Sequence, residues 1–288
     1  QTIVHAGFDP FFVSEDEVAA GALEKKGVRV LVLPMTLAMG ALPAWKGLIY
    51  ATNPVAFDPY LQPRALSDAS RVKPLPAKAE DFARELAGSG LKPEASVRDL
   101  EGKPMPTVVV SVHALGTDAA ILCVLRDPVG QQELVGADGV VHMVDDPKGG
   151  RPIEAASLDV SSFAGRHFFD MRRRVELQPE GGRLRLDLPA GQAVPVAALP
   201  YGAPVLTVDV TRKDDRLKVA ASEKVTLPHV VRMAVVDKST GKEDPRLSRN
   251  LLLQAGRVEV EIPLAVEERA RPLEVRLTDI LTGASATK

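Results

Sequence analysis

This chain of 288 residues has a single cysteine, no long apolar run and no excess of positive charge. The single cysteine, Cys123, has no second thiol for an internal disulfide, and its apolar neighbours at 119–125 are typical of a buried thiol. No apolar run approaches the roughly 20 residues that cross a bilayer. Lys and Arg total 36 against 38 Asp and Glu, which creates no field that attracts nucleic acid or an anionic membrane. We therefore expect neither nucleic acid nor a membrane as a partner.

Motifs that signal catalysis are also missing. The phosphate-binding patterns GxxxxGK[ST] and GxGxxG, the nucleophile elbow GxSxG and the calcium loop DxDxDG do not occur. The histidines do not pair at the spacing of a helical metal site. Aspartates at expected strand ends have the sequence context of turns; they are Asp127, Asp145, Asp146, Asp170, Asp237 and Asp279. We expect no catalytic residue, no metal site and no cofactor in this chain.

The first part of the chain has an α/β pattern. Short apolar strands are expected at 2–6, 28–33 and 47–52. A helix is expected after the N-cap residue Ser14, ending at Gly27, and another over 77–86. Strand, helix and strand at this spacing predict a βαβ unit in a parallel sheet. The proline-rich stretch 53–76 is expected to be irregular.

The remainder of the chain has a β pattern without a convincing long helix. A first series of short strands is expected at 108–113, 119–125, 140–144, 155–160, 166–169, 183–188 and 193–199. The sequence Pro-Tyr-Gly-Ala-Pro at 200–204 predicts a linker. A second series is expected at 205–211, 217–221, 229–237, 250–254, 258–262 and 273–279. The regular spacing of this second series predicts a seven-stranded immunoglobulin-like sandwich.

Aromatic residues make up only 4% of the chain, and several of them lie close together in sequence near Trp45, the sole tryptophan. Amphipathic aromatic rings can serve as a stacking platform for the faces of sugars. We name Trp45, Tyr50 and Tyr60 as candidate carbohydrate-binding residues. The same rings could instead form a hydrophobic plug in place of a missing helix, and both interpretations stay open.

Three short stretches of sequence, which we call phrases, follow one another along the chain. The first runs from Phe11-Phe12 through Gly21-Ala22-Leu23 to the expected strand that ends in Leu33-Pro34. The second contains Phe168-Phe169-Asp170, Leu188-Pro189-Ala190-Gly191 and Leu199-Pro200-Tyr201. The third begins at His229-Val230-Val231-Arg232-Met233 and ends in Thr278-Asp279-Ile280-Leu281-Thr282-Gly283.

In this order the phrases resemble the region that follows the catalytic barrel in bacterial β-galactosidase-like glycoside hydrolases. The resemblance implies an α+β multidomain fold. It comprises a partial flavodoxin-like, amidotransferase-like α/β segment at 1–92, an antiparallel β-domain at 93–201 and an immunoglobulin-like β-sandwich at 202–288. Because Gly40 leads almost directly to the strand after Gly47, we expect a helix of the α/β segment to be shortened or lost.

The resemblance also implies where chemistry would reside. The catalytic glutamates of such enzymes lie in an upstream barrel that this chain does not contain, so none is carried over to it. Their amidotransferase-like domain mediates oligomer contacts and lacks the amidotransferase nucleophile. Here too no cysteine lies near Leu33.

The leading hypothesis is a non-catalytic accessory region whose partner is an upstream catalytic barrel or another subunit. We expect it to be secreted or periplasmic, with a cytoplasmic location left open. The sequence starts at Gln1 without the features of a signal peptide, so either a signal was removed or the chain is a piece of a longer one. We expect the second, because 2–6 has the pattern of a strand that is already under way. One alternative is a free-standing carbohydrate-binding or cell-surface β-sandwich protein that uses Trp45 or Tyr60. Another is a small hydrolase that uses Asp145 or Asp146.

Overall fold

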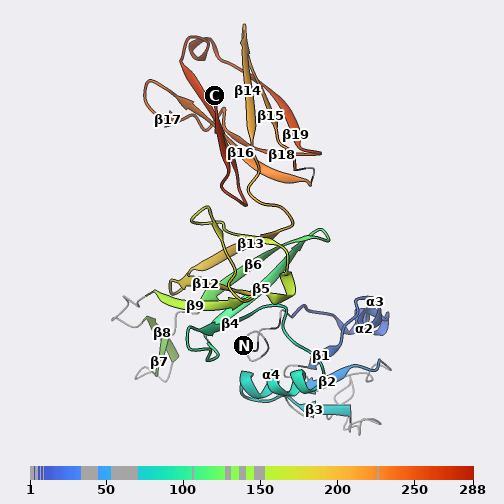
Figure 1. Ribbon diagram of the computed structural model, residues 1–288. Coiled ribbons are helices and arrows are strands. Elements are labelled where there is room, and N and C mark those ends of the chain that lie inside the picture. Colours follow the sequence, from blue (N-terminus) through green and yellow to red (C-terminus); the bar gives the residue numbers. More distant parts are fainter. Residues whose placement is uncertain are drawn as a thin grey trace. The chain divides into compact units, whose positions relative to one another are not determined.

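The computed structural model describes residues 10–33, 45–52, 71–105, 107–126, 153–225 and 227–288, the single residues Ile3, Ala6 and Phe8, and the backbone of 131–135 and 141–145 (Figure 1). The chain divides into two compact units, Gln1–Pro93 and Glu94–Lys288, which we describe separately. The domain boundaries expected at 92 and 201 stay predictions. In the described part of the chain, no helix has the length and apolar character needed to span a membrane.

The first unit contains a small parallel sheet and short helices. In chain order its elements are α2 (Glu15–Ala19), α3 (Ala22–Lys25), β1 (Val30–Leu33), β2 (Leu48–Ala51), β3 (Val72–Pro74) and α4 (Ala79–Gly88). The strands pair in parallel in the order β1-β2-β3, which confirms the expected parallel sheet. Alternate residues of β1 and β2 pack into separate apolar clusters, because successive side chains of a strand point to opposite faces.

Three expectations for the first unit are wrong in detail. The stretch 53–76, expected to be irregular, contains β3. The single helix expected after Ser14 is two short helices, because Gly21 takes a left-handed conformation (φ +78°) between them. Ser14 does cap the first of them, in a capping box with Glu17. Of the strand expected at 2–6, the structure describes Ile3 and Ala6, where the amide of Ala6 donates to the carbonyl of Ile3 (3.2 Å) in a turn.

The second unit begins with a sandwich of two antiparallel sheets, which we call the first sandwich. One sheet has the order β11-β10-β13-β6-β5: β11 (Val175–Leu177), β10 (His167–Asp170), β13 (Ala193–Leu199), β6 (Ala119–Arg126) and β5 (Val108–Leu115). The other has the order β12-β9-β4: β12 (Arg183–Leu188), β9 (Glu154–Asp159) and β4 (Ser96–Asp99). The leucines of β12 are buried between the sheets and its arginines are exposed, as the alternating sequence predicts. A separate hairpin pairs β7 (Gln131–Val135) with β8 (Val141–Asp145).

The second sandwich follows in the same unit. One sheet has the order β14-β15-β19: β14 (Thr207–Lys213), β15 (Arg216–Ser222) and β19 (Arg257–Pro263). The other contains β17 (Lys242–Glu243), β16 (His229–Asp237), β20 (Leu273–Asp279) and β21 (Ser285–Thr287), with β18 (Arg249–Leu253) also paired to β16. These are eight strands in two antiparallel sheets where seven were expected, because the very short β17 and β21 were not anticipated. The two-sheet sandwich itself was expected.

The fold class is therefore mostly β, as predicted: a small parallel sheet with helices, then several antiparallel sheets.

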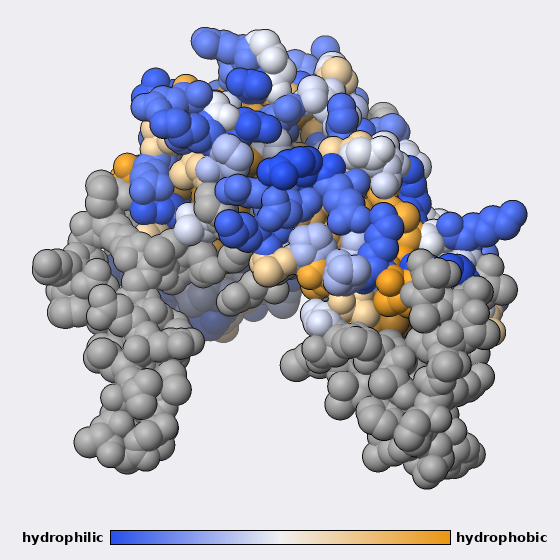
Figure 2. Space-filling model, turned by 90° about the horizontal axis from the view of Figure 1, so that it is seen from below, coloured by the Kyte–Doolittle hydropathy of each residue, from blue (hydrophilic) through white to orange (hydrophobic). Residues whose placement is uncertain are grey.

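Hydrophilic residues predominate among the coloured atoms on the face drawn in Figure 2. On the exposed face of β15 and β19, cross-strand ion pairs join Lys218 to Glu259 (2.6 Å) and Arg216 to Glu261 (3.1 Å). Such exposed pairs contribute little to stability, so the apolar interior of each sandwich must provide most of it.

Candidate functional site: a joint between two sandwiches

The outer face of the β10–β13–β6 sheet carries an apolar cluster that joins the two sandwiches of the second unit. Phe169, Ala197 and Leu199 come from the first sandwich and are buried. Leu281, from the turn that follows β20 in the second sandwich, packs against them and is only 8% exposed. Tyr201 adds its ring from the expected linker, so this segment is part of a packed contact. We call this region the joint.

The turn that carries Leu281 is organised by Asp279. One carboxylate oxygen, Oδ1, accepts hydrogen bonds from the amides of Leu281 (2.9 Å) and Thr282 (2.7 Å) and from the Thr282 hydroxyl (2.9 Å). Gly283 ends the turn with φ +79°, and a Cβ there would lie 2.3 Å from the Cβ of Arg174 in the first sandwich. Only glycine satisfies both the backbone conformation and this close approach.

A buried cluster of ionisable side chains lies beside the apolar part of the joint. His229 Nε2 is 2.6 Å from Glu223 Oε1 and 3.3 Å from Asp279 Oδ2, and all three side chains are at most 1% exposed. Strand register explains part of this convergence, because Asp279 on β20 pairs with Val231, two residues after His229 on β16. Glu223 follows β15, and its carbonyl lies so close to Gly256 that a Cβ there would be 2.6 Å away.

The electrostatics of this cluster are unfavourable to charge. Burial raises the pKa of Glu223 above its ordinary value, the nearby imidazole of His229 opposes that rise, and the carboxylate of Asp279 adds to it. Burial also raises the pKa of Tyr201, whose ring centroid is 6.3 Å from that of His229. The Glu223 oxygens, His229 Nε2 and Asp279 Oδ2 make no ordinary hydrogen bond among the described residues. Buried polar atoms without partners are rare, so this cluster requires an explanation.

A metal ion does not fit between these side chains as they stand. Tetrahedral ligand atoms about 2.0 Å from a zinc ion lie more than about 3 Å apart, whereas Nε2 and Oε1 are separated by 2.6 Å. Within the described ranges, no group of His, Cys, Asp or Glu is arranged to hold a metal. The short separation brings an acid and a base together without the angle of an ordinary hydrogen bond.

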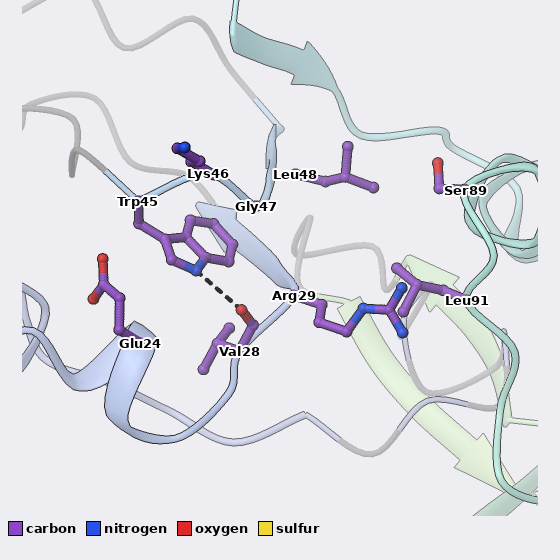
Figure 3. A pocket seen from close by; sticks show the side chains of 9 residues that line it. All are labelled: Glu24, Val28, Arg29, Trp45, Lys46, Gly47, Leu48, Ser89 and Leu91. Atoms are coloured by element: carbon purple, nitrogen blue, oxygen red, sulfur yellow. Dashed lines mark hydrogen bonds between the residues drawn. The ribbon is translucent and has the colours of Figure 1, made fainter.

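The candidate carbohydrate residue Trp45 lies in the first unit, at the wall of a pocket of about 670 Å³ (Figure 3). Its indole Nε1 donates to the carbonyl oxygen of Val28 (3.0 Å), and its ring lies so close to Gly47 that a Cβ there would be 1.9 Å away. The indole is therefore 7% exposed. Arg29 extends from the same wall towards Leu91 and supplies a cation.

This pocket lies at the amino-terminal ends of the parallel strands. Arg29 directly precedes β1 and Gly47 directly precedes β2. In open α/β sheets, ligands are instead bound outside the carboxyl ends of the strands. The Trp45 pocket therefore differs in position from the ligand site of a flavodoxin-like domain.

Tyr50 does not lie beside Trp45. Residues of β2 alternate between faces, so Tyr50 packs into the cluster with Phe82 of α4 (ring centroids 5.1 Å apart), whereas Trp45 belongs to the cluster on the other face. The Tyr50 side chain is fully enclosed, and burial, with Glu85 nearby, raises its pKa to about 12. Tyr60 lies outside the described residues. Carbohydrate binding by these residues stays a prediction.

The aspartates expected to be turn residues have that role wherever their side chains are described. Asp170 accepts from the amides of Arg172 and Arg173, and Asp237 accepts from the amide of Ser239 (2.8 Å). Asp279 is a turn residue and also a member of the buried cluster. The side chain of Asp145, and Asp127 and Asp146 altogether, lie outside the described part.

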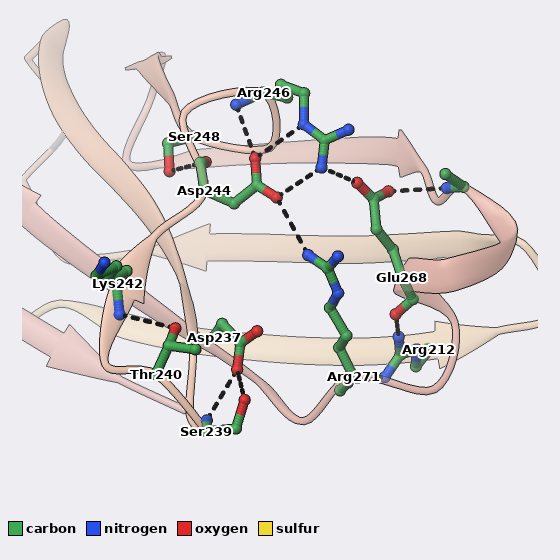
Figure 4. A network of polar contacts seen from close by, with 11 residues as sticks. Arg212, Asp237, Ser239, Thr240, Lys242, Asp244, Arg246, Ser248, Glu268 and Arg271 are labelled. Atoms are coloured by element: carbon green, nitrogen blue, oxygen red, sulfur yellow. Dashed lines mark hydrogen bonds and ion pairs between the residues drawn. The ribbon is translucent and has the colours of Figure 1, made fainter.

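A second polar network ties loops of the second sandwich together (Figure 4). The Asp244 carboxylate accepts from the amide (3.0 Å) and guanidinium (2.9 Å) of Arg246, with Arg271 3.9 Å away. Arg246 also pairs with Glu268 (2.6 Å), whose other oxygen accepts from the amide of Ala265 (2.8 Å). The hydrogen bond from Arg246 holds the pKa of Asp244 below its usual value. Each charge here has an opposite partner, as in a structural brace.

Glu223 and His229 were missed as a pair by reasoning from the sequence. One signal was available for His229: it shares the buried face of β16 with Val231, Met233 and Val235, at the period of two expected for a strand. A histidine in such a row is enclosed unless the strand begins outside the core. Nothing in the sequence around Glu223 distinguishes it from exposed glutamates such as Glu259.

Comparison with known proteins gives structural similarities only. No protein-family model matches the sequence, and no curated protein matches it. An apo exo-carrageenase GH42 from Bacteroides ovatus is structurally similar over 69% of this chain and 25% of that chain, with a TM-score of 0.35 and 12% identity. A β-glucuronidase of Ruminococcus gnavus is similar over 69% of this chain and 44% of that chain, with a TM-score of 0.21 and 10% identity.

These similarities place glycoside-hydrolase chains among the structural neighbours of part of this β-rich chain. The chain spans a quarter and less than half of their respective lengths. Both TM-scores are low, and neither similarity indicates an activity, a substrate or a residue role.

Proposed function

We propose that this chain is a non-catalytic accessory region of a carbohydrate-active enzyme, of the β-galactosidase-like glycoside hydrolase type. In this proposal the joint keeps the two sandwiches in a defined arrangement, so that they can support an upstream catalytic barrel or contact another subunit. The enzyme would be secreted or periplasmic.

The observation that carries the proposal is the convergence of the second and third phrases at the joint. Leu199 and Tyr201 belong to the second phrase, and His229 and the turn from Asp279 to Gly283 belong to the third. Leu199, His229, Asp279 and Leu281 are buried, so they are placed to hold two sandwiches together and not to meet a substrate. This gives the second and third phrases a common physical role.

The test is the size and activity of the native polypeptide in its source cells, detected with an antibody against this chain. We expect a polypeptide several times larger than 30.8 kDa, and glycosidase activity in the precipitated material. A polypeptide no larger than this chain would overturn the proposal.

Variants of the full-length protein then distinguish a structural role of the joint from a role in catalysis. Leu281→Asp should lower the temperature of inactivation or change the assembly size, because it places a charge in the apolar joint, while KM stays unchanged. The matched control is Leu252→Asp, at a leucine of β18 that is 49% exposed. Equal behaviour of the two variants would contradict a supporting role for the joint.

Carbohydrate binding at the Trp45 pocket is the second candidate function. Its favourable observation is a pocket that combines an aromatic wall with two exposed cations, Arg29 and Lys46. Calorimetric titration with neutral and acidic oligosaccharides tests it, comparing the wild type with Arg29→Ala and Lys46→Ala. These exposed substitutions leave the buried indole in place, so loss of binding reports on the pocket. Absence of binding to the wild type would remove this candidate.

A further inference from the structure

The tautomer of His229 is set by its second ring nitrogen. Nδ1 lies 2.9 Å from the carbonyl oxygen of Leu227, which can only accept, so Nδ1 carries a hydrogen and donates it. Nε2, which lacks that hydrogen, is therefore the ring atom that faces Glu223 and Asp279. If Nε2 and Glu223 Oε1 both lacked a proton, two electron-rich atoms would lie 2.6 Å apart with no hydrogen between them.

The charge of the cluster leads to the same conclusion. Without an additional proton, the ionised carboxylates of Glu223 and Asp279 would leave two negative charges beside a neutral imidazole, with all three side chains enclosed. An uncompensated buried charge is strongly destabilising. One proton at Nε2 or Oε1 removes one of the two charges and the lone-pair repulsion together.

We propose that one proton held between Glu223 and His229 locks the two sandwiches of the second unit together, and that its release as the pH rises loosens the joint. The proposal concerns a conformational device and does not depend on which enzyme the chain supports. Two further titratable groups face the cluster: Asp279 from the end of β20 and Tyr201 from the segment after β13. On the far side of the Asp279 turn, Arg174 contacts Gly283.

The sign of the pH dependence follows from Glu223. Because burial raises the pKa of Glu223 in the folded protein, the folded state binds the proton more tightly than the unfolded state does. The stabilisation is fully present below the ordinary value of 4.5 and is lost as the pH rises through the raised pKa. The lock is thus closed in acid and opens as the pH rises through the raised pKa of Glu223.

A cavity borders residues that contact the cluster. Its volume is about 390 Å³, and its lining includes Tyr201, Leu227 and Leu281. Leu227 is the residue whose carbonyl accepts from His229, and Leu281 is held by Asp279. Small movements of these residues would open a path for the proton without unfolding either sandwich.

The test is hydrogen–deuterium exchange on the full chain between about pH 5 and about pH 9, the range in which a shared proton of this kind can be released. The amides of Leu281 and Thr282 report directly, because both donate to Asp279 Oδ1. Above the raised pKa of Glu223, we expect their exchange, corrected for the intrinsic rate, to increase up to tenfold per pH unit. Amides inside β15 should show no such increase. If the exchange of the Leu281 and Thr282 amides has the same pH dependence as that of the β15 amides, the proposal is wrong.

Variants and a chelator complete the test. Glu223→Gln keeps the size of the side chain and removes its titration, so the extra pH dependence of both reporters should vanish. Glu261→Gln, at an exposed partner of Arg216, should behave as the wild type. Persistence of the extra dependence in Glu223→Gln would overturn the proposal. So would loss of protection on addition of a chelator at constant pH, because an ion would then occupy the place of the proton. The wild-type measurement decides the matter if Glu223→Gln does not fold.

Discussion

The second sandwich contains two clusters of ionisable side chains that differ in their surroundings. At the Asp244 network each carboxylate faces a guanidinium, and the Arg246 side chain remains 62% exposed. At the joint, Glu223 and Asp279 share one imidazole, and every side chain is enclosed. The pKa of Asp244 is accordingly lowered, by its hydrogen bond from Arg246, and that of Glu223 is raised by burial.

The comparison shows that residue type does not determine the response of a carboxylate to pH. Solvent and an excess of positive partners stabilise the charged form, whereas enclosure beside a second carboxylate favours the neutral form. The network is therefore expected to stabilise the fold at neutral pH and the joint to weaken as the pH rises. Four predictions, in order of decreasing effect, can break or sharpen this contrast.

The largest effect is expected from removing the carboxylate that organises the joint. Asp279→Ala leaves two buried amides and a hydroxyl without their acceptor, so we expect a loss of about 3–4 kcal/mol in the free energy of unfolding. Urea denaturation measures it. Asp237→Ala is the matched control, because Asp237 also caps a turn at a strand end but is open to solvent, which can replace it. Equal losses in both variants would contradict the special role of the joint.

The next effect concerns close packing across the joint. Gly283→Ala should cost about 2–3 kcal/mol, because its Cβ would collide with Arg174 and its φ is +79°. Gly241→Ala, near the Asp244 network, has a similar φ of +68° but no atom within 4 Å, so only about 1 kcal/mol of backbone strain is expected. Thermal unfolding of both variants, followed by circular dichroism, separates collision from strain. Combining Gly283→Ala with Arg174→Gly should recover part of the loss.

A smaller effect is expected within the network. Glu268→Ala removes the acceptor of the Ala265 amide and a partner of Arg246, for an expected loss of about 1–2 kcal/mol in the free energy of unfolding. Water can reach Arg246 and replaces part of what is lost. Urea denaturation at high and low salt checks this, and the loss should be smaller at high salt. A loss as large as that of Asp279→Ala would remove the distinction between the clusters.

The smallest effect is the acid dependence of the network. Because the pKa of Asp244 is lowered in the folded protein, its stabilisation is present above the ordinary value of 3.8 and is lost as the pH falls through the lowered pKa. Asp244→Asn should therefore reduce the acid sensitivity of unfolding, measured by fluorescence or circular dichroism. The direction is opposite to that expected for Glu223. An increase in acid sensitivity would contradict the assignment.

Several elements could be predicted from the sequence because local patterns determine them. The leucines of β12 alternate with arginines and are buried as expected, and Ser14 caps a helix together with Glu17. The helix expected beyond Ser14 is interrupted at Gly21, because the backbone of this residue is left-handed and does not continue a helix. The short strands β17 and β21 lack a pattern of their own and form only because β16 and β20 offer free edges.

The β-rich class, the parallel sheet of the first unit and the turn role of Asp279 could be predicted, because each has a signature in a short stretch of sequence. Only the tertiary structure decided that Glu223, His229 and Asp279 meet, and that Tyr201 of the expected linker packs beside them. The physical reason is that burial and charge pairing depend on the register between strands and on the contact between sheets. Neither can be deduced from the residues that precede and follow each one along the chain.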